Sequence, residues 1–207
     1  MDILFWSGGK DAYLALQFYK RQYPNRKVHL FTTFDGIRDW VPHQNIAISN
    51  IRNHAQKLGL TLHLLSLPRE CPNEVYLQRI EETFNGLEYR PKRLIFGDLR
   101  VEEIRQWRED AFGQRGYSCC FPIWHKDIHT LLPVLQLSPV TLEISAVSEE
   151  YRHLISVGER YDQQFVKHLN YLDEDIDLMG EKGEFHTKLT IHEPEKPAGQ
   201  HNRPAIG

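Results

Sequence analysis

The sequence predicts an α/β fold built on a mainly parallel sheet. Apolar runs of strand length recur along the chain, and segments with helical periodicity lie between them. Strands that alternate with helices are joined by right-handed crossovers, which place helices on both faces of the sheet. The 207 residues, of which 41% are hydrophobic, are enough for one sizeable core and a small additional lobe.

The predicted elements follow one another in a regular order. Strand-like runs cover residues 2–6, 28–34, 61–67, 93–96 and 140–147. Helical patterns cover residues 11–21, 44–58, 73–87, 101–116 and 126–135. In sheets of this kind, ligands gather at the carboxyl ends of the strands. We therefore expect the loop after the first strand and the pair Gly97 and Asp98 after the fourth to share one crevice.

The composition changes after Val147. Residues 148–172 have the pattern of one long, mostly polar helix, and an acidic segment and a last strand at 188–192 follow. The end of the chain carries three prolines and few apolar residues, which is typical of a loosely held tail. The sequence thus predicts a first domain over residues 1–147, a C-terminal lobe over residues 148–192 and a tail over residues 193–207.

Charge and composition narrow the classes of function. A net charge of −3 gives no overall basic field to attract nucleic acid, although a local basic patch stays open. No stretch is long and apolar enough to span a membrane, and Lys10 and Asp11 interrupt the one early apolar run, so we expect a cytoplasmic protein without a signal peptide. The adjacent Cys119 and Cys120 are too close for a disulfide, and we expect both to be buried thiols on a strand.

The loop after the first strand has the pattern of an anion-binding site. It reads Ser7, Gly8, Gly9, Lys10, Asp11, Ala12 and leads into an amphipathic helix. The glycines let an anion approach the backbone, Ser7 is placed to cap the helix, and the free N–H groups of a helix start attract phosphate. Lys10 would add a mobile cation. A plain tight turn is the alternative, and the strand–turn–helix context favours the phosphate site.

This loop resembles the SGGxDS signature of the N-type PP-loop ATP pyrophosphatases. The resemblance implies that Ser7 to Ala12 hold the β- and γ-phosphates of ATP as leaving pyrophosphate, with Asp11 binding Mg²⁺. It also implies that the adenine lies near the end of the second strand, at Thr32, Thr33 and Phe34. Ala12 stands where the signature has its final serine, which removes one hydrogen bond worth about 1 kcal/mol.

A second motif lies near the other end of the chain. Residues 180–187 read Gly-Glu-Lys-Gly-Glu-Phe-His-Thr and resemble the GExGEFHT motif of the diphthine–ammonia ligase family, a branch of the same superfamily. Between the two motifs, residues 96–98, Trp107 and residues 122–124 are similar to further family segments, so the resemblance covers residues 1–192. Met179 stands where many members have cysteine. An ordinary hairpin is the alternative for residues 180–187.

The resemblance implies a Rossmann-like fold of the adenine nucleotide α-hydrolase type and an AMP-forming ligase. A substrate carboxylate would be adenylated and then amidated by ammonia, as in diphthamide synthesis, with ATP and Mg²⁺ as cofactors. The partner would be diphthine on elongation factor 2 in an archaeal or eukaryotic protein and another carboxylate in a bacterial one. A homodimer is left open. The candidate catalytic residues are Lys10, Asp11, Glu184 and His186; the candidate nucleotide-binding residues are Ser7 to Ala12, Thr32 to Phe34, Gly97 and Asp98.

Two other classes of function stay open. An RNA-modifying PP-loop ATPase would share the phosphate loop, but it should have a basic surface or, for thiolation, a pair of sulfur-handling cysteines. A non-catalytic module that binds ATP or AMP would keep the loop and release no product.

Overall fold

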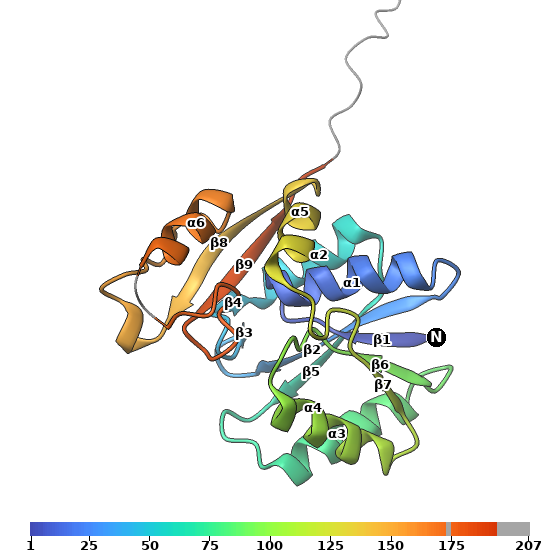
Figure 1. Cartoon of the computed structure of the whole chain (residues 1–207). Helices are drawn as coiled ribbons and strands as arrows, with labels where there is room; N and C mark the ends of the chain where they lie inside the picture. The colour runs from blue at the N-terminus through green and yellow to red at the C-terminus, as the bar shows by residue number, and fades with distance from the viewer. Residues whose placement is uncertain (173–174, 194–207) are drawn as a thin grey trace, which may run out of the picture.

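The computed structural model describes residues 1–172 and 175–193 and has the expected α/β fold (Figure 1). Its strands are β1 (Asp2–Phe5), β2 (Val28–Asp35), β3 (Trp40–Val41), β4 (Ile46–Ala47), β5 (Leu62–Leu67), β6 (Arg93–Ile95), β7 (Ser118–Cys120), β8 (Val140–Val147) and β9 (Phe185–Ile191). Its helices are α1 (Lys10–Gln22), α2 (Ile48–Leu58), α3 (Asn73–Asn85), α4 (Glu102–Gly113), α5 (Ile128–Gln136) and α6 (Gln163–Tyr171).

The main sheet is parallel except at one end. β5, β2, β1, β6 and β7 lie side by side in parallel, and the short β3 and β4 extend β2 in antiparallel pairing. β1 is the point where the strand order reverses, because Asp2 pairs with Val28 of β2 on one side and Arg93 of β6 on the other. At such a switch point the loops leave in opposite directions and open a crevice at the carboxyl ends of the strands.

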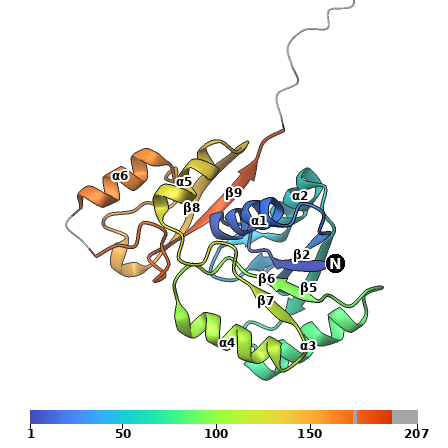
Figure 2. The same ribbon diagram turned by 45° about the vertical axis from the view of Figure 1, so that its right-hand side comes forward.

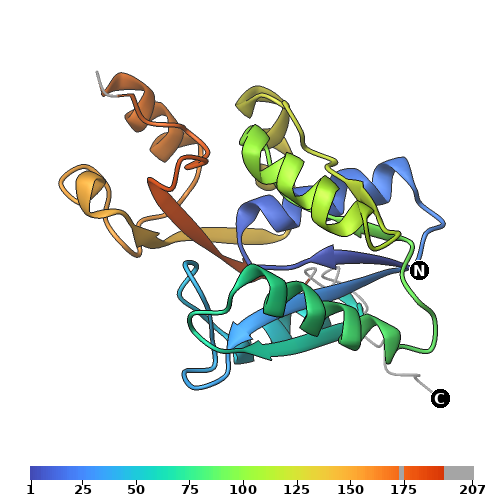
Figure 3. The same cartoon turned by 90° about the horizontal axis from the view of Figure 1, so that it is seen from below.

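Helices cover both faces of this sheet (Figure 2). Successive strand residues point to opposite faces, so Leu4 and Leu30 pack with α1 and α2, whereas Ile3 and Phe31 pack in a second cluster with α3 and α4. The view from below looks onto α3 and α4 (Figure 3). Both clusters are well buried, so the sheet gives the loops at its carboxyl edge a rigid support.

A second sheet packs against the start of α1. β8 and β9 pair antiparallel, with Val140 opposite Ile191, and together with α6 they form the lobe on the left of Figure 1. β9 also contacts α1 and α2, since Leu189 N–H donates to the Gly8 carbonyl at 2.9 Å and His54 Nε2 donates to the Leu189 carbonyl at 2.8 Å. The C-terminal lobe is therefore fixed directly onto the loop that follows β1.

Three expectations about the elements are wrong. Residues 140–147 form a strand, but it pairs with β9 in the second sheet, and β7 occupies the edge of the main sheet. Residues 148–172 are not one helix; a 3₁₀ turn at Glu149–Tyr151 is separated from α6 by a segment that contains Gly158 at φ +89°. The second helix begins at Ile48 rather than residue 44, because the residues before it form the β3–β4 hairpin.

The division of the chain after Val147 stays a prediction. β8, which it assigns to the first domain, pairs with β9 of the C-terminal lobe. The predicted tail lies outside the described residues from residue 194 onward. The adjacent Cys119 and Cys120 lie on β7 as expected, and both are half-buried free thiols. None of the helices in residues 1–172 and 175–193 is long and apolar enough to cross a membrane.

Candidate functional site

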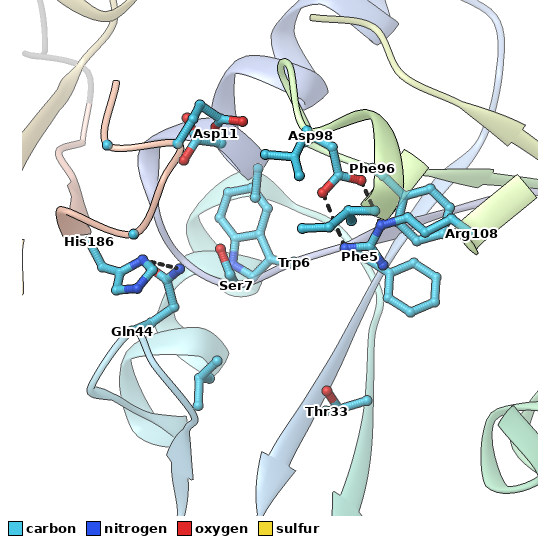
Figure 4. A pocket seen from close by; sticks show the side chains of 18 of the residues that line it. Phe5, Trp6, Ser7, Asp11, Thr33, Gln44, Phe96, Asp98, Arg108 and His186 are labelled. Carbon is cyan, nitrogen blue, oxygen red and sulfur yellow. Dashed lines mark hydrogen bonds and ion pairs between the residues drawn. The ribbon is translucent and has the colours of Figure 1, made fainter. Parts of the chain in front are cut away.

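A cavity of about 350 Å³ lies at the carboxyl ends of β1, β2 and β6 (Figure 4). The loop after β1 lines it together with Gly97 and Asp98, so the two segments share one crevice as the sequence predicts. The remaining wall comes from the β3–β4 hairpin, from α3 and α4, and from the 180–187 segment. Its lining residues are Phe5, Trp6, Ser7, Asp11, Ala12, Phe31, Thr33, Val41, Gln44, Tyr76, Phe96, Gly97, Asp98, Val101, Ile104, Arg108, Gly180, Glu181, Gly183 and His186.

The start of α1 is capped from the distant lobe and not by Ser7. Ser7 Oγ accepts a hydrogen bond from Gly9 N–H at 3.3 Å, within the loop. The N–H of Lys10, the first helical residue, donates to Thr187 Oγ1 at 3.0 Å. Gly8 has φ +82°, which only glycine adopts without strain and which gives the loop its turn. The expected cap is thus supplied by the last residue of the second motif.

Two amides of α1 remain free for an anion. Within the described residues, the N–H groups of Asp11 and Ala12 have no acceptor. Gly97 passes so close to them that a methyl group on it would lie 2.8 Å from the Asp11 carbonyl carbon and 3.0 Å from Ala12 N. Unpaired N–H groups at a helix start, together with the positive end of the helix dipole, favour a bound phosphate.

Lys10 is a buried structural cation, and the expectation of a mobile one is wrong. Its side chain is 2% exposed, and Nζ donates to both Asp11 carboxylate oxygens at 2.9 and 2.8 Å. The ammonium also lies 5.8 Å from the Tyr161 ring centre and 5.7 Å from that of Phe185. These rings belong to the C-terminal lobe, which closes over Lys10 and keeps it out of the cavity.

Asp11 lines the cavity and is suited to bind a hard cation. Its side chain is 29% exposed, although Lys10 already holds both oxygens. Carboxylate oxygens are the ligands that Mg²⁺ prefers, usually together with substrate phosphates. Within the described residues, no group of three or more His, Cys, Asp or Glu side chains forms a ready-made metal site. The donor set therefore fits a Mg²⁺ ion that arrives with a phosphate ligand.

Glu184 is buried in its own loop and does not face the cavity. It is 1% exposed, and its two oxygens accept hydrogen bonds from the N–H groups of Asp177 and Lys182, each at 2.9 Å. A buried carboxylate satisfied in this way holds the segment in shape. The expectation that Glu184 and His186 both face the phosphate loop is therefore wrong for Glu184.

His186 does line the cavity. Its Nδ1 lies 3.4 Å from Gln44 Nε2 of the β3–β4 hairpin (Figure 4). Burial, and then the charge of Lys10, lower the pKa of His186, so the imidazole is neutral at pH 7. A neutral imidazole is able to accept a proton.

Glu181 is a cavity residue that the sequence analysis missed. Its Oε2 accepts a hydrogen bond from Leu99 N–H at 3.2 Å. Burial, and then the negative charge of Asp11, raise the pKa of Glu181 to about 7. In the sequence, Glu181 and Glu184 each follow a nearby glycine and look alike. Only the turn between Gly180 at φ +69° and Gly183 at φ +90° separates them, and no local signal reveals it.

The far wall of the cavity is aromatic, with one ion pair. Asp98 does not cap α4; Arg108 holds it through Nε–Oδ2 at 2.6 Å and Nη2–Oδ1 at 3.2 Å (Figure 4). The guanidinium lies 4.4 Å from the ring centre of Phe96. Arg108 and the ring of Phe96 were also missed, because the pairing depends on how α4 folds back over β6.

The three candidate adenine residues have different surroundings. Thr33 lines the cavity. Thr32 is buried and donates its hydroxyl to the Trp6 carbonyl at 2.6 Å, and Phe34 packs against the core next to α1 and α2. Only Thr33 of the three thus lies in the wall, and an aromatic surface that contains Phe5 and Phe96 lies beside it.

Replacing Asp11 by Asn is expected to destabilise the protein by about 1–3 kcal/mol. The change leaves the buried Lys10 ammonium without its partner, which costs about 3–5 kcal/mol for a fully buried pair and less here because Asp11 is partly exposed. The double variant with Lys10→Met should recover much of the loss, since the methionine fills the same apolar surroundings. Urea denaturation of the three proteins measures this, and a double variant as unstable as Asp11→Asn would contradict it.

No protein-family model and no curated protein matches the chain. Two solved structures are similar to it. One is described as a predicted subunit of tRNA methyltransferase from Methanocaldococcus jannaschii, with 20% identity, a TM-score of 0.41 and coverage of 74% of this chain and 83% of that one. The other is the U34-tRNA thiolase NcsA from Methanococcus maripaludis with its [4Fe-4S] cluster, with 14% identity, a TM-score of 0.41 and coverage of 66% and 57%. At these values the function has to be argued from the site itself.

Proposed function

We propose that the chain is an ATP-using enzyme of the PP-loop pyrophosphatase type, which adenylates its substrate and releases pyrophosphate. One observation carries the proposal. The loop at residues 7–12, the Gly97–Asp98 pair and the segment at residues 180–187 line the same cavity, although they come from distant parts of the chain. These are the segments that carry the resemblance to that superfamily.

The phosphates of ATP would bind at the start of α1. The free N–H groups of Asp11 and Ala12 and the helix dipole attract the negative charge, and Gly97 leaves room for it. Asp11 would hold Mg²⁺, which neutralises charge that develops on the leaving pyrophosphate. Lys10 acts indirectly, since it fixes the position of the Asp11 carboxylate through two hydrogen bonds.

The finer proposal is amidation of a carboxylate, as in the diphthine–ammonia ligase family. The substrate carboxylate attacks the α-phosphorus, pyrophosphate leaves, and ammonia then displaces AMP from the acyl adenylate. His186 supports this reading because a neutral imidazole in the cavity is able to orient a nucleophile by hydrogen bonding. The substrate would be diphthine or another carboxylate. The cytoplasmic location stays a prediction, and a homodimer is still open.

Product analysis tests the proposal. The full chain is incubated with ATP, Mg²⁺, ammonium and a panel of carboxylic acids, and the nucleotides are separated. AMP and pyrophosphate are expected, and their amount should depend on one of the acids. ADP and phosphate would overturn the proposal, and tight ATP binding without any product would favour the non-catalytic module. Gly113→Ala serves as a control, because this glycine faces open space in α4.

RNA modification is the second candidate function. Both similar structures have descriptions that mention tRNA. TM-scores of 0.41 do not decide the substrate, so the assay includes an arm with unmodified tRNA in place of the acid. Thiolation by this chain's own cysteines is disfavoured, because no cysteine lines the cavity and burial raises the pKa of Cys119 to about 11. AMP release that depends on tRNA would select this candidate.

A further inference from the structure

The turn at residues 180–183 presents one carboxylate to the cavity. Glu184 fixes the turn from below through the N–H groups of Asp177 and Lys182, and Gly183 N–H donates to the Gly180 carbonyl at 3.2 Å. Glu181 lies between these fixed points and lines the cavity. A side chain on such a turn is held in place before any ligand binds, which is what a reacting group requires.

Glu181 differs from the other carboxylates around it by its partners. Both oxygens of Asp11 are held by Lys10, and both oxygens of Asp98 are held by Arg108. Glu184 is satisfied by backbone N–H groups. Glu181 accepts one hydrogen bond, from Leu99 N–H, and has no cationic partner in the part of the chain that the structure describes.

The charges that face Glu181 keep it weakly basic at neutral pH. Asp11 of α1 and Asp98 beyond β6 oppose its ionisation, whereas Lys10 and the Leu99 N–H favour it. His186 of β9 lines the same cavity and is neutral at pH 7. Burial and the two aspartates prevail, and the pKa of Glu181 rises to about 7. A carboxylate in that range takes and releases a proton readily under physiological conditions.

We propose that Glu181 is the proton acceptor of the acyl-transfer step. The inference rests on the proposed amidation. The nitrogen of ammonia forms a bond to the acyl carbon and becomes positively charged, and one of its protons passes to the Glu181 carboxylate. The bond between the acyl carbon and the AMP oxygen then breaks, and AMP leaves with the electron pair. The proton on Glu181 later returns to solvent, and the carboxylate is regenerated.

The test compares two nucleophiles in Glu181→Gln. With ammonium, amide formation should fall about 100-fold or more, the usual loss when a general base is removed. With hydroxylamine the variant should work near the wild-type rate, because the hydroxylamine adduct is more acidic and gives its proton to water unaided. AMP binding should be unchanged. Glu88→Gln, an exposed carboxylate outside the cavity, is the matched control and should behave as wild type with both nucleophiles.

Equal rates for wild type and Glu181→Gln with ammonium would overturn the inference. A loss of equal size with both nucleophiles would do so as well, because it would show a structural role. A second measurement holds without a known substrate: in a carbon-13 NMR titration, one glutamate carboxyl should titrate near neutral pH in the wild type and be absent from Glu181→Gln. A Glu181 carboxyl that titrates below pH 5 overturns the inference. If no acid yields AMP, the proposed function fails while this titration still decides the protonation of Glu181.

Discussion

Alanine in place of Gly97 is expected to weaken ATP binding at least about tenfold and to destabilise the fold. The new methyl group would lie 2.8 Å from the Asp11 carbonyl carbon, 2.9 Å from its oxygen and 3.0 Å from Ala12 N. All three are backbone atoms of the first turn of α1, so no side chain is able to move aside, and the helix start has to shift. Overpacking of this kind costs about 1–3 kcal/mol, and the displaced N–H groups no longer converge on the phosphate.

Calorimetric titration with a non-hydrolysable ATP analogue and urea denaturation measure the two effects of Gly97→Ala. The matched control is Gly113→Ala in α4, where a methyl group meets nothing within 4 Å. That variant should bind the analogue as the wild type does and gain up to about 1 kcal/mol of stability, since alanine is the better helix former. If Gly97→Ala bound the analogue with wild-type affinity, the phosphates would have to lie elsewhere.

The sequence reveals the main sheet because its signals are local. The apolar runs at β1 and β2 and the helices between them follow from the residues themselves, and the right-handed crossover rule then fixes where the loops gather. The shared crevice of Ser7 and Gly97 is a consequence of that order alone. It was therefore predictable without any knowledge of side-chain contacts.

The errors concern contacts between residues far apart in the chain. The strand character of β8 is visible in the sequence, but its partner β9 is not, because antiparallel pairing leaves no mark in either strand taken alone. Lys10 has the position of a phosphate ligand, and its burial depends on Tyr161 and Phe185 in the distant lobe. The same limit explains why Thr187, and not Ser7, caps α1.

The two glutamates of the 180–187 segment are expected to affect stability in opposite directions, and Glu184 is the stabilising one. Its carboxylate is 1% exposed and accepts two backbone N–H groups. Glu184→Gln turns one acceptor into a donor that faces an N–H, so it should cost about 1.5–3 kcal/mol, the usual value for a hydrogen bond to a charged group. The loop that carries Glu181 should loosen as well, and hydrogen exchange at Asp177 and Lys182 would reveal this.

Glu181→Gln is expected to stabilise the protein, and only above about pH 5. The pKa of Glu181 is raised from 4.5 to about 7 in the folded state, so the folded protein binds more protons than the unfolded chain between these values. The wild type therefore loses stability as the pH rises through this window, by up to about 3 kcal/mol at 1.36 kcal/mol per pKa unit. Glutamine carries no charge and escapes the loss. Urea midpoints at pH 4.5 and pH 8 measure the difference, which should be near zero at the lower value and largest at the higher. The same pH dependence in both proteins would contradict the prediction, whereas a gain in stability joined to a loss of amide formation is typical of a charged group kept for chemistry at the expense of the fold.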